Sequence, residues 1–366
     1  MAAMSAPDIS DSTLLNHCSA LDTTEQKKPK FLHQIQSLPQ LEPTAPFQLP
    51  TVPELSSHNA AILVELRAFI DSDQLIPDLF EVGSPSYQRA VDYCTTPCLR
   101  RHLTSLKWNL AHAKQCIRET LVWREEYRPD LITAKDVESE AANGNTYING
   151  MDKEGRPIIY VRKRGALGDP EKNVRLVVYT MECAIRLMPQ GVEKMSMIFD
   201  FTHYAKANSP PIHITRMMLK FIISHYPERM GVAFFVNTPW VFGMLWNVIS
   251  HFLDPATKSK IYFIKLDQER LNAGENTHNN QDISNGLSNT STVSLPTPAS
   301  SWSLFSFGMT NQKRHADSEP ELAPSLGVQL SNMISEKVLE KDFGGSYDYK
   351  YDYSKYTDEL KKHNIL

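Results

Sequence analysis

The chain has 366 residues, of which 41% are hydrophobic and 22% are charged, and its formal net charge is −4 at pH 7. This composition supports a globular body with a substantial core, and the net charge argues against a nucleic-acid-binding protein. The five cysteines are irregularly spaced and odd in number, which favours a reducing compartment over a disulfide framework. No signal peptide and no run of 18 apolar residues are visible, so we expect a cytoplasmic protein without a transmembrane helix.

The first part of the chain reads as a tail followed by a small helical lobe. Residues 1–53 are rich in Pro, Ser, Thr and Gln, which predicts a disordered tail. Residues 54–130 show helical periodicity. In the last of these helices Asn109 suits an N-cap, and Pro129 ends the pattern.

Strands and helices alternate from residue 140 to residue 269. Apolar runs of strand length are separated by helical patterns and occur at 158–162, 195–202, 231–237 and 260–266. This alternation is typical of βαβ units, so we predict an α/β domain with a mostly parallel sheet.

The C-terminal third contains a change of composition. Residues 270–325 are polar and of low complexity, which predicts a disordered insertion. We expect the domain to resume at 326–346 and a Tyr- and Asp-rich tail to occupy 347–366.

Known catalytic and metal-binding motifs are absent from the sequence. We find no GxGxxG, GxxxxGK[ST], GxSxG or HExxH pattern. Cys94, Cys98 and His102 have helical spacing, but no fourth ligand is near, so a core helix is the preferred interpretation and no metal is expected. Asp200 and His203 follow a predicted strand, where α/β enzymes place catalytic groups, yet no nucleophile accompanies them. The sequence therefore favours a binding protein without a cofactor over an enzyme.

Residues 240–253 form an apolar helical segment without a formally charged residue. Fourteen residues would span roughly 21 Å, which is short of the roughly 30 Å hydrocarbon layer of a membrane. One interpretation is a helix buried in the core. The other is a lid with one face on an apolar ligand cavity and the other on a membrane, where tryptophans favour the interface. The candidate lid residues are Trp240, Phe242, Leu245, Trp246, Ile249 and Phe252.

Charged residues introduce two of the predicted strands. Glu228 leads into the strand at 231–237, and Thr257 and Lys260 lead into the strand at 260–266. The beginnings of neighbouring parallel strands lie at one edge of a sheet, so Glu228 and Lys260 are expected to be close. A carboxylate accepts hydrogen bonds from sugar-like hydroxyls, and an ammonium group holds a phosphate. A phosphorylated polyol with two acyl chains would fit this polar rim around an apolar interior.

These same segments resemble a known family. YPERMG at 226–231, NTPWVF at 237–242 and FLDPATKSKI at 252–261 resemble the CRAL-TRIO lipid-binding domain of the fungal phosphatidylinositol-transfer proteins. The segment LRRHLTSLKWN at 99–109 resembles the helical lobe of that family, and the resemblance covers about residues 95–265.

The resemblance implies an α/β fold with a small N-terminal helical lobe, followed by a CRAL-TRIO domain with a mostly parallel sheet and a large apolar lipid cavity. It implies that the protein binds phosphatidylinositol and transfers it between membranes. The headgroup contacts of the family fall on Glu228, Thr257 and Lys260, and Arg229 and Arg101 are additional candidates.

Two departures from the family bear on the ligands. Leu106 stands where the family has an arginine, which leaves one phosphate contact open. Met195 and Met197 replace the small hydroxyl residues of the family's choline-lipid site, so phosphatidylcholine binding is expected to be lost. These departures resemble a subgroup in which another apolar molecule, such as a sterol, is the second ligand.

The resemblance further implies a monomer that associates transiently with membrane surfaces, such as those of the endoplasmic reticulum, the Golgi or lipid droplets. Two alternatives stay open at this point. One is an interaction module that transfers no lipid, and the other is a lipid ester hydrolase acting through Asp200 and His203.

Overall fold

The computed structural model describes most of the helical and α/β regions of the chain. The described residues are 47, 51–71, 75–162, 168–205, 210–240, 242–243, 246, 250–251, 253–266, 329–363 and 365. The predicted insertion at 270–325 and the candidate lid residues Leu245, Ile249 and Phe252 lie outside them.

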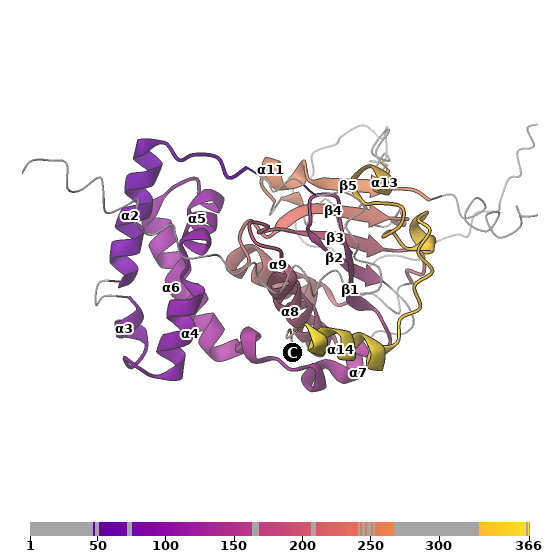
Figure 1. Ribbon diagram of the computed structural model, residues 1–366, viewed down its shortest axis with the longest axis horizontal. Coiled ribbons are helices and arrows are strands. Elements are labelled where there is room, and N and C mark those ends of the chain that lie inside the picture. Colours follow the sequence, from indigo (N-terminus) through magenta and orange to yellow (C-terminus); the bar gives the residue numbers. More distant parts are fainter. Residues whose placement is uncertain are drawn as a thin grey trace, which may run out of the picture.

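The N-terminal lobe is helical where the structure describes it, and it lies to one side of the sheet (Figure 1). Its helices are α2 (Ser57–Asp71), α3 (Ile76–Leu79), α4 (Pro85–Tyr93), α5 (Thr96–Ser105) and α6 (Leu110–Tyr127). They form one apolar core in which Leu66, Leu99 and Ile117 are completely buried.

Helix α6 begins and ends as its sequence predicts. The Asn109 side chain accepts a hydrogen bond from the backbone N–H of His112 at 3.1 Å. Arg128, with a left-handed φ of 51°, ends the helix directly before Pro129. Three short elements then lead to the sheet, namely η1 (Pro129–Leu131), η2 (Ala134–Val137) and α7 (Glu138–Ala141).

The sheet has the strand order β1-β2-β3-β4-β5. Its strands are β1 (Thr146–Met151), β2 (Pro157–Arg162), β3 (Met195–Asp200), β4 (Met230–Val236) and β5 (Ile261–Ile264). The first pair is antiparallel and the other three pairs are parallel, so the predicted mostly parallel sheet is confirmed. The sheet begins one strand earlier than the sequence analysis predicted, with β1.

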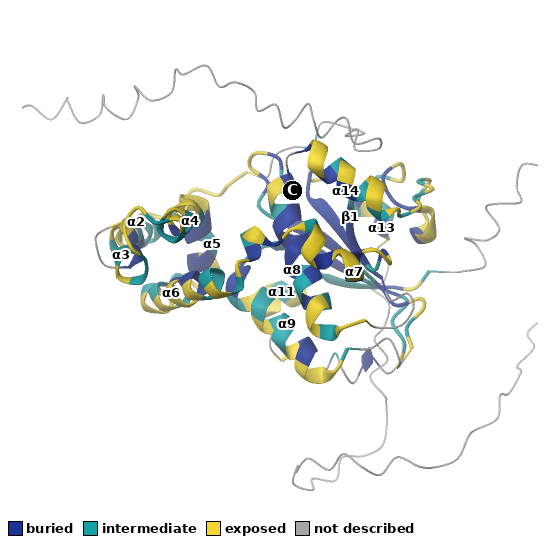
Figure 2. Ribbon diagram, turned by 90° about the horizontal axis from the view of Figure 1, so that it is seen from below, coloured by how far each residue is buried: buried dark blue, intermediate teal, exposed yellow. Residues whose placement is uncertain are grey.

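The sheet lies between two layers (Figures 1 and 2). Helices α8 (Pro170–Leu187) and α9 (Ile212–His225) cover one face, and α8 is capped by Asp169, whose side chain accepts hydrogen bonds from two backbone N–H groups. The other face is covered by a C-terminal segment, residues 329–350, which contains α13 (Leu330–Met333) and η4 (Lys341–Phe343). The short helix α11 (Pro255–Lys258) precedes β5.

Helix α14 (Tyr353–Lys362) falls in the region predicted as a tail. It packs beside β1, where the Tyr356 hydroxyl accepts a hydrogen bond from the backbone N–H of Ile148 at 3.1 Å. Asp352 caps its N-terminus by accepting from the N–H of Lys355. This part of the chain therefore belongs to the folded domain.

A buried arginine joins the sheet to the C-terminal segment. Arg162, at the end of β2, is 5% exposed. Its Nε lies 3.1 Å from Oδ2 of Asp200, and its Nη1 lies 3.1 Å from Oε2 of Glu340. The network holds the C-terminal segment against the strands.

The two faces of the sheet are covered to different extents. One row of cross-strand neighbours, toward the C-terminal segment, is at most 1% exposed and consists of Tyr147, Tyr160, Ile198 and Phe234. The adjacent row points to the other face and is only half-buried; it consists of Val161, Phe199, Phe235 and Phe263. We call this second set the half-covered row. Parallel sheets are normally covered on both faces, so the helices that the structure describes leave this row incompletely covered.

Candidate functional site

Three charged residues lie together where β3, β4 and β5 begin. Lys194 directly precedes β3, Glu228 lies just before β4, and Lys260 directly precedes β5. The Oε2 atom of Glu228 lies 3.5 Å from Nζ of Lys260 and 3.6 Å from Nζ of Lys194. One carboxylate between two ammonium groups leaves an excess positive charge, which suits an anionic ligand.

The structure thus brings together two of the residues singled out from the sequence and adds a third. Lys194 was missed, although the same reasoning applies to it, because it leads into the strand MSMIFD just as Lys260 leads into IYFI. All three side chains are partly exposed, between 24% and 40%, so solvent or a ligand can reach them.

The backbone of Glu228 is unusual. Its φ of 56° lies in the left-handed region, which costs a non-glycine residue roughly 1–3 kcal/mol. Residues on both sides of it, Pro227 and Arg229, line a cavity toward the helical lobe, whereas Glu228 pairs with the two lysines. Because of this turn, the Glu228 side chain contacts the two lysines, whereas Pro227 and Arg229 face the cavity. Strain of this kind is concentrated at functional sites.

Thr257 lies in the turn before Lys260 and has a partner within the protein. Its hydroxyl donates to Oδ2 of Asp254 at 2.5 Å, and its backbone carbonyl accepts from the N–H of Lys260 at 3.2 Å. The hydrogen bond from Thr257 is the main cause that lowers the pKa of the Asp254 carboxyl. Asp254 also caps α11, so the loop that carries Thr257 and Lys260 is held by one aspartate.

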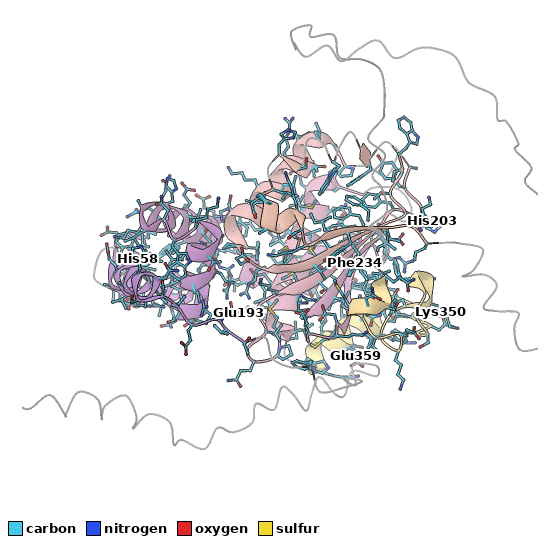
Figure 3. The ribbon with its side chains drawn as sticks, turned by 90° about the horizontal axis from the view of Figure 1, so that it is seen from above. His58, Glu193, His203, Phe234, Lys350 and Glu359 are labelled. Carbon is cyan, nitrogen blue, oxygen red and sulfur yellow. The ribbon has the colours of Figure 1, made fainter. Side chains whose placement is uncertain are left out.

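Arg229 and Arg101 lie on the side of the helical lobe. Nη1 of Arg229 donates to the backbone carbonyl of Glu193 at 2.8 Å, and Nη1 of Arg101 lies 2.5 Å from Oε2 of Glu193. Figure 3 labels Glu193 at the junction between lobe and sheet. Both arginines line the cavity there, which Glu228 does not line.

The residues that depart from the family pattern are built into apolar cores. Leu106 packs against the core of the helical lobe. Met195 and Met197 are 1% and 5% exposed and belong to the core between the sheet and α8. They present no hydroxyl group to a ligand.

Described residues of the candidate lid cover part of the half-covered row. Phe242 is 5% exposed, and its ring centroid lies 5.5 Å from that of Phe235. Trp246, four residues further along the chain, lies 6.1 Å from Phe235 and 5.1 Å from Phe263 between ring centroids. Trp240 is 86% exposed. The segment therefore presents two aromatic rings to the sheet and one to solvent.

Asp200, which was considered for catalysis, and His102, which was considered as a metal ligand, both have structural partners. The Asp200 carboxylate is 3% exposed, accepts from Arg162, and accepts from the N–H of Thr202 at 2.9 Å. His102 is buried and lies 3.1 Å from the Tyr93 hydroxyl.

The described part of the chain holds neither a cluster of metal ligands nor a membrane-spanning helix. Within it, no group of three or more His, Cys, Asp or Glu side chains has the arrangement of a metal site. Among the helices that the structure describes, none has both the length and the apolar character needed to span a membrane.

Comparison with known proteins gives consistent matches. Residues 141–273 match the family model of the CRAL/TRIO domain. The phosphatidylinositol transfer protein PDR17 of Saccharomyces cerevisiae is 34% identical over 219 residues, which cover 54% of this chain and 63% of that protein. A CRAL-TRIO domain-containing protein of Schizosaccharomyces pombe is 32% identical over 195 residues, which cover 51% of this chain and 19% of that protein.

A third relative is the phosphatidylinositol transfer protein CSR1 of Eremothecium gossypii, which is 27% identical over 182 residues covering 46% of this chain and 42% of that protein. The matched region thus spans less than two thirds of the length of each of these relatives. The crystal structure of Sfh5 matches with a TM-score of 0.48 and 17% identity, over 60% of this chain and 84% of that chain.

Proposed function

Because the chain carries a CRAL/TRIO domain and is similar to fungal phosphatidylinositol transfer proteins, we propose that it binds phosphatidylinositol and transfers it between membranes. In this function it is a carrier and not an enzyme. It works in the cytoplasm and associates reversibly with membrane surfaces, such as those of the endoplasmic reticulum, the Golgi or lipid droplets.

The observation that carries the proposal is the half-covered row. Four apolar side chains on adjacent strands remain partly exposed, and two of them, Phe235 and Phe263, lie against the described lid residues Phe242 and Trp246. Burial of apolar surface contributes roughly 25 cal/mol per Å². Acyl chains that cover this row would remove its apolar surface from water, which favours their binding.

Glu228 and Lys260 lie at a distance from the half-covered row that a single lipid molecule can span. Glu228 precedes Phe235 by seven positions, and Lys260 precedes Phe263 by three. At about 3.3 Å per residue, Lys260 and Phe263 are about 10 Å apart along β5, and Glu228, which contacts Lys260, lies at the same end of the sheet. A ligand with a polar head and long apolar chains can contact both.

We assign each headgroup residue a role that follows from its chemistry. Glu228 accepts hydrogen bonds from inositol hydroxyls, and the ammonium groups of Lys260 and Lys194 bind the phosphate. The Thr257 hydroxyl exchanges its hydrogen bond with Asp254 for one with the headgroup. Without ligand, both lysines share the Glu228 carboxylate, and one positive charge remains in excess for the phosphate to neutralise.

The lid controls access in this proposal. Phe242 and Trp246 leave the row when the segment at 240–253 swings out, and Trp240 enters the membrane interface. A sterol is proposed as a second ligand of the same apolar row, since it needs no phosphate site. Phosphatidylcholine is excluded because Met195 and Met197 offer its phosphate no hydroxyl group.

The experiment is a phosphatidylinositol transfer assay between vesicles with Glu228→Ala and Lys260→Ala. Losing a hydrogen bond to a charged group costs roughly 1.5–3 kcal/mol, so each variant should lower transfer about tenfold to a hundredfold. The double variant should be little worse, because both groups serve one ligand. Lys258→Ala, an exposed lysine of the same loop, is the matched control. Wild-type transfer by both folded single variants would refute the proposal.

A further inference from the structure

A cavity of about 310 Å³ lies between the helical lobe and the α/β domain. Side chains from α4, α5 and α6 form one wall, and α8 with residues 225–227 and Arg229 forms the other. Neither the half-covered row nor Glu228, Lys194 or Lys260 contributes to it. The cavity is therefore separate from the site of the proposed function.

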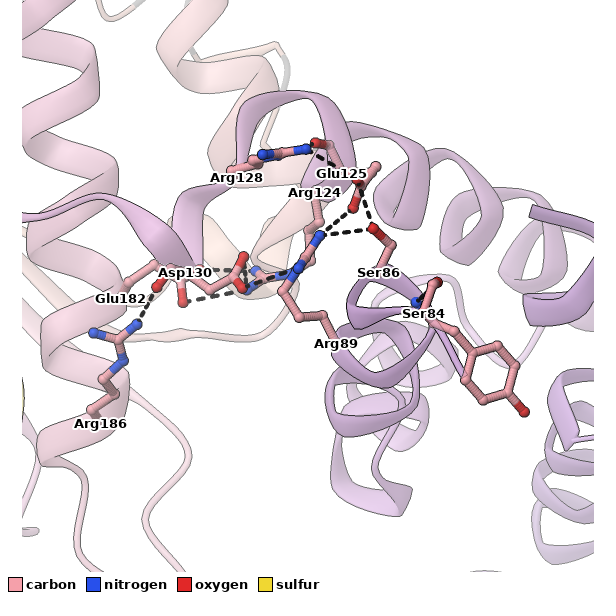
Figure 4. Close-up of polar contacts among 10 residues, drawn as sticks. Ser84, Ser86, Arg89, Arg124, Glu125, Arg128, Asp130, Glu182 and Arg186 are labelled. Carbon is pink, nitrogen blue, oxygen red and sulfur yellow. Dashed lines mark hydrogen bonds and ion pairs between the residues drawn. The ribbon is translucent and has the colours of Figure 1, made fainter. Parts of the chain in front are cut away.

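Four arginines line this cavity, and they form two pairs. At one end Arg89 and Arg124 flank Asp130, with distances of 3.8 Å and 3.5 Å to its carboxylate (Figure 4). Arg89 also pairs with Glu125 at 2.6 Å, and Arg124 pairs with Glu182 at 2.9 Å. Arg128 lies 3.4 Å from Glu125 as well, so three acids and three arginines balance one another at this end.

The opposite end has an excess of positive charge, because two arginines meet one acid there. Arg101 and Arg229 meet at Glu193, but only Arg101 contacts its carboxylate, while Arg229 contacts its backbone carbonyl. Among the described residues no carboxylate lies within ion-pair distance of Arg229. Burial, followed by the repulsion of Arg101, lowers the pKa of Arg229 to about 10. Arg229 is partly buried, and a partly desolvated cation without a carboxylate in contact favours an anionic ligand at this end.

From these observations we propose that the cavity binds a phosphorylated polyol, with its phosphate on Arg101 and Arg229 and its hydroxyls toward Asp130 and Glu182. Guanidinium groups present parallel N–H donors that match phosphate oxygens, and carboxylates accept hydrogen bonds from hydroxyls. The volume is at the lower end of the range for small-molecule sites, which suits a compact ligand without acyl chains. Such a ligand bridges the lobe and the domain.

The test is isothermal titration of the full chain with three probes, namely inositol 1-phosphate, inorganic phosphate and unphosphorylated inositol. Inositol 1-phosphate should bind tightest, inorganic phosphate more weakly, and inositol not measurably. Arg229→Gln should weaken binding of inositol 1-phosphate about tenfold or more, because charged hydrogen bonds are lost. Arg101→Gln supplies a second variant should Arg229→Gln not fold. Arg216→Gln, an exposed arginine on α9, is the matched control and should bind as the wild type does.

Glu228→Ala separates this site from the phosphatidylinositol site. It should lose lipid transfer and retain binding of inositol 1-phosphate. Loss of that binding in Glu228→Ala, its persistence in both arginine variants, or no binding by the wild type would each overturn the inference. Vesicles containing a phosphorylated phosphatidylinositol identify the source of the ligand. If these vesicles displace inositol 1-phosphate, the site binds a lipid headgroup. If they do not displace it, the site binds a soluble polyol phosphate.

Discussion

Arg162 and Glu340 form a buried ion pair, with 3.1 Å between Nη1 and Oε2, that links β2 to the segment covering the far face of the sheet. Arg162 also binds Asp200 and Asp342, so one guanidinium serves three acids. Burial, opposed by the hydrogen bond from Asn149 and by Arg162, raises the pKa of Glu340. Without Arg162, the buried acids Asp200 and Glu340 would lose the cation that both contact.

We expect Arg162→Met to destabilise the protein by about 3–5 kcal/mol, because it leaves buried acids without a cation. Glu340→Gln keeps an oxygen that accepts hydrogen bonds and removes one of three negative charges, so its effect should be about 1 kcal/mol. Urea unfolding of both variants compares the two. Equal losses would mean that the network is not organised around the arginine.

Lys194→Gln should lower phosphatidylinositol transfer about fivefold. Its side chain is 40% exposed, so we assign it about 1 kcal/mol, less than a buried charge would contribute. The difference from wild type should shrink at high salt because exposed charges are screened. Lys258→Gln is the control for general loss of surface charge. Transfer by Lys194→Gln at the wild-type rate would remove this lysine from the headgroup site.

The two ends of the lid segment should respond differently to substitution. Trp240 is exposed, so Trp240→Ala should change stability by no more than about 0.5 kcal/mol but weaken binding to vesicles. Phe242 is buried against Phe201 and Phe235, so Phe242→Ala should destabilise by about 3 kcal/mol. Thermal unfolding and vesicle sedimentation measure both quantities. Unchanged vesicle binding by Trp240→Ala would argue against membrane contact at this position.

Lipid selection follows from the two buried methionines of β3. The wild-type protein should transfer phosphatidylinositol and leave phosphatidylcholine near background, since Met195 and Met197 supply no hydrogen-bond donor to a choline phosphate. Parallel assays with either lipid in the donor vesicles decide the point. Comparable rates for the two lipids would contradict the expectation.

The interface between lobe and domain should make stability depend on pH. Burial, followed by Arg101, lowers the pKa of His102 to about 3, and burial, followed by Lys220, lowers that of His225 to about 4. The unfolded chain therefore binds more protons than the folded one below pH 6.5, and stability should fall as the pH is lowered from 6.5 toward 4. Each histidine can contribute up to about 1.4 kcal/mol per pH unit. His102→Gln and His225→Gln should each reduce the slope of unfolding free energy against pH, whereas His112→Gln, which is exposed, should not.

The sequence was informative where a local rule applied. The rule that neighbouring parallel strands begin at one edge placed Glu228 beside Lys260, and the N-cap Asn109 and the helix breaker Pro129 bounded a helix correctly. Lys194 follows from the same rule and was overlooked. The strand β1 was not predicted because it pairs in the antiparallel direction with β2 across a short turn, outside the βαβ pattern.

Other features depend on contacts that no local pattern encodes. Arg162 and Glu340 are far apart in the sequence, and nothing near either residue identifies the other. The cavity lined by Arg101 and Arg229 depends on how the helical lobe is placed against the domain, which is settled by packing between α6, α8 and α9. The left-handed conformation of Glu228 is likewise a product of its surroundings, since glutamate has no preference for it.

Residues 329–350 cover one face of the sheet but are synthesised after all of its strands. This order has a consequence for the chain during translation. Once β1 to β5 have been synthesised, the row of Tyr147, Tyr160, Ile198 and Phe234 has no cover until residues 329–350 follow. Incomplete chains that expose apolar surface aggregate readily and are bound by chaperones. A ribosome paused within residues 267–328 would carry a sheet with one bare face, so chaperone occupancy of nascent chains should be greatest over this interval.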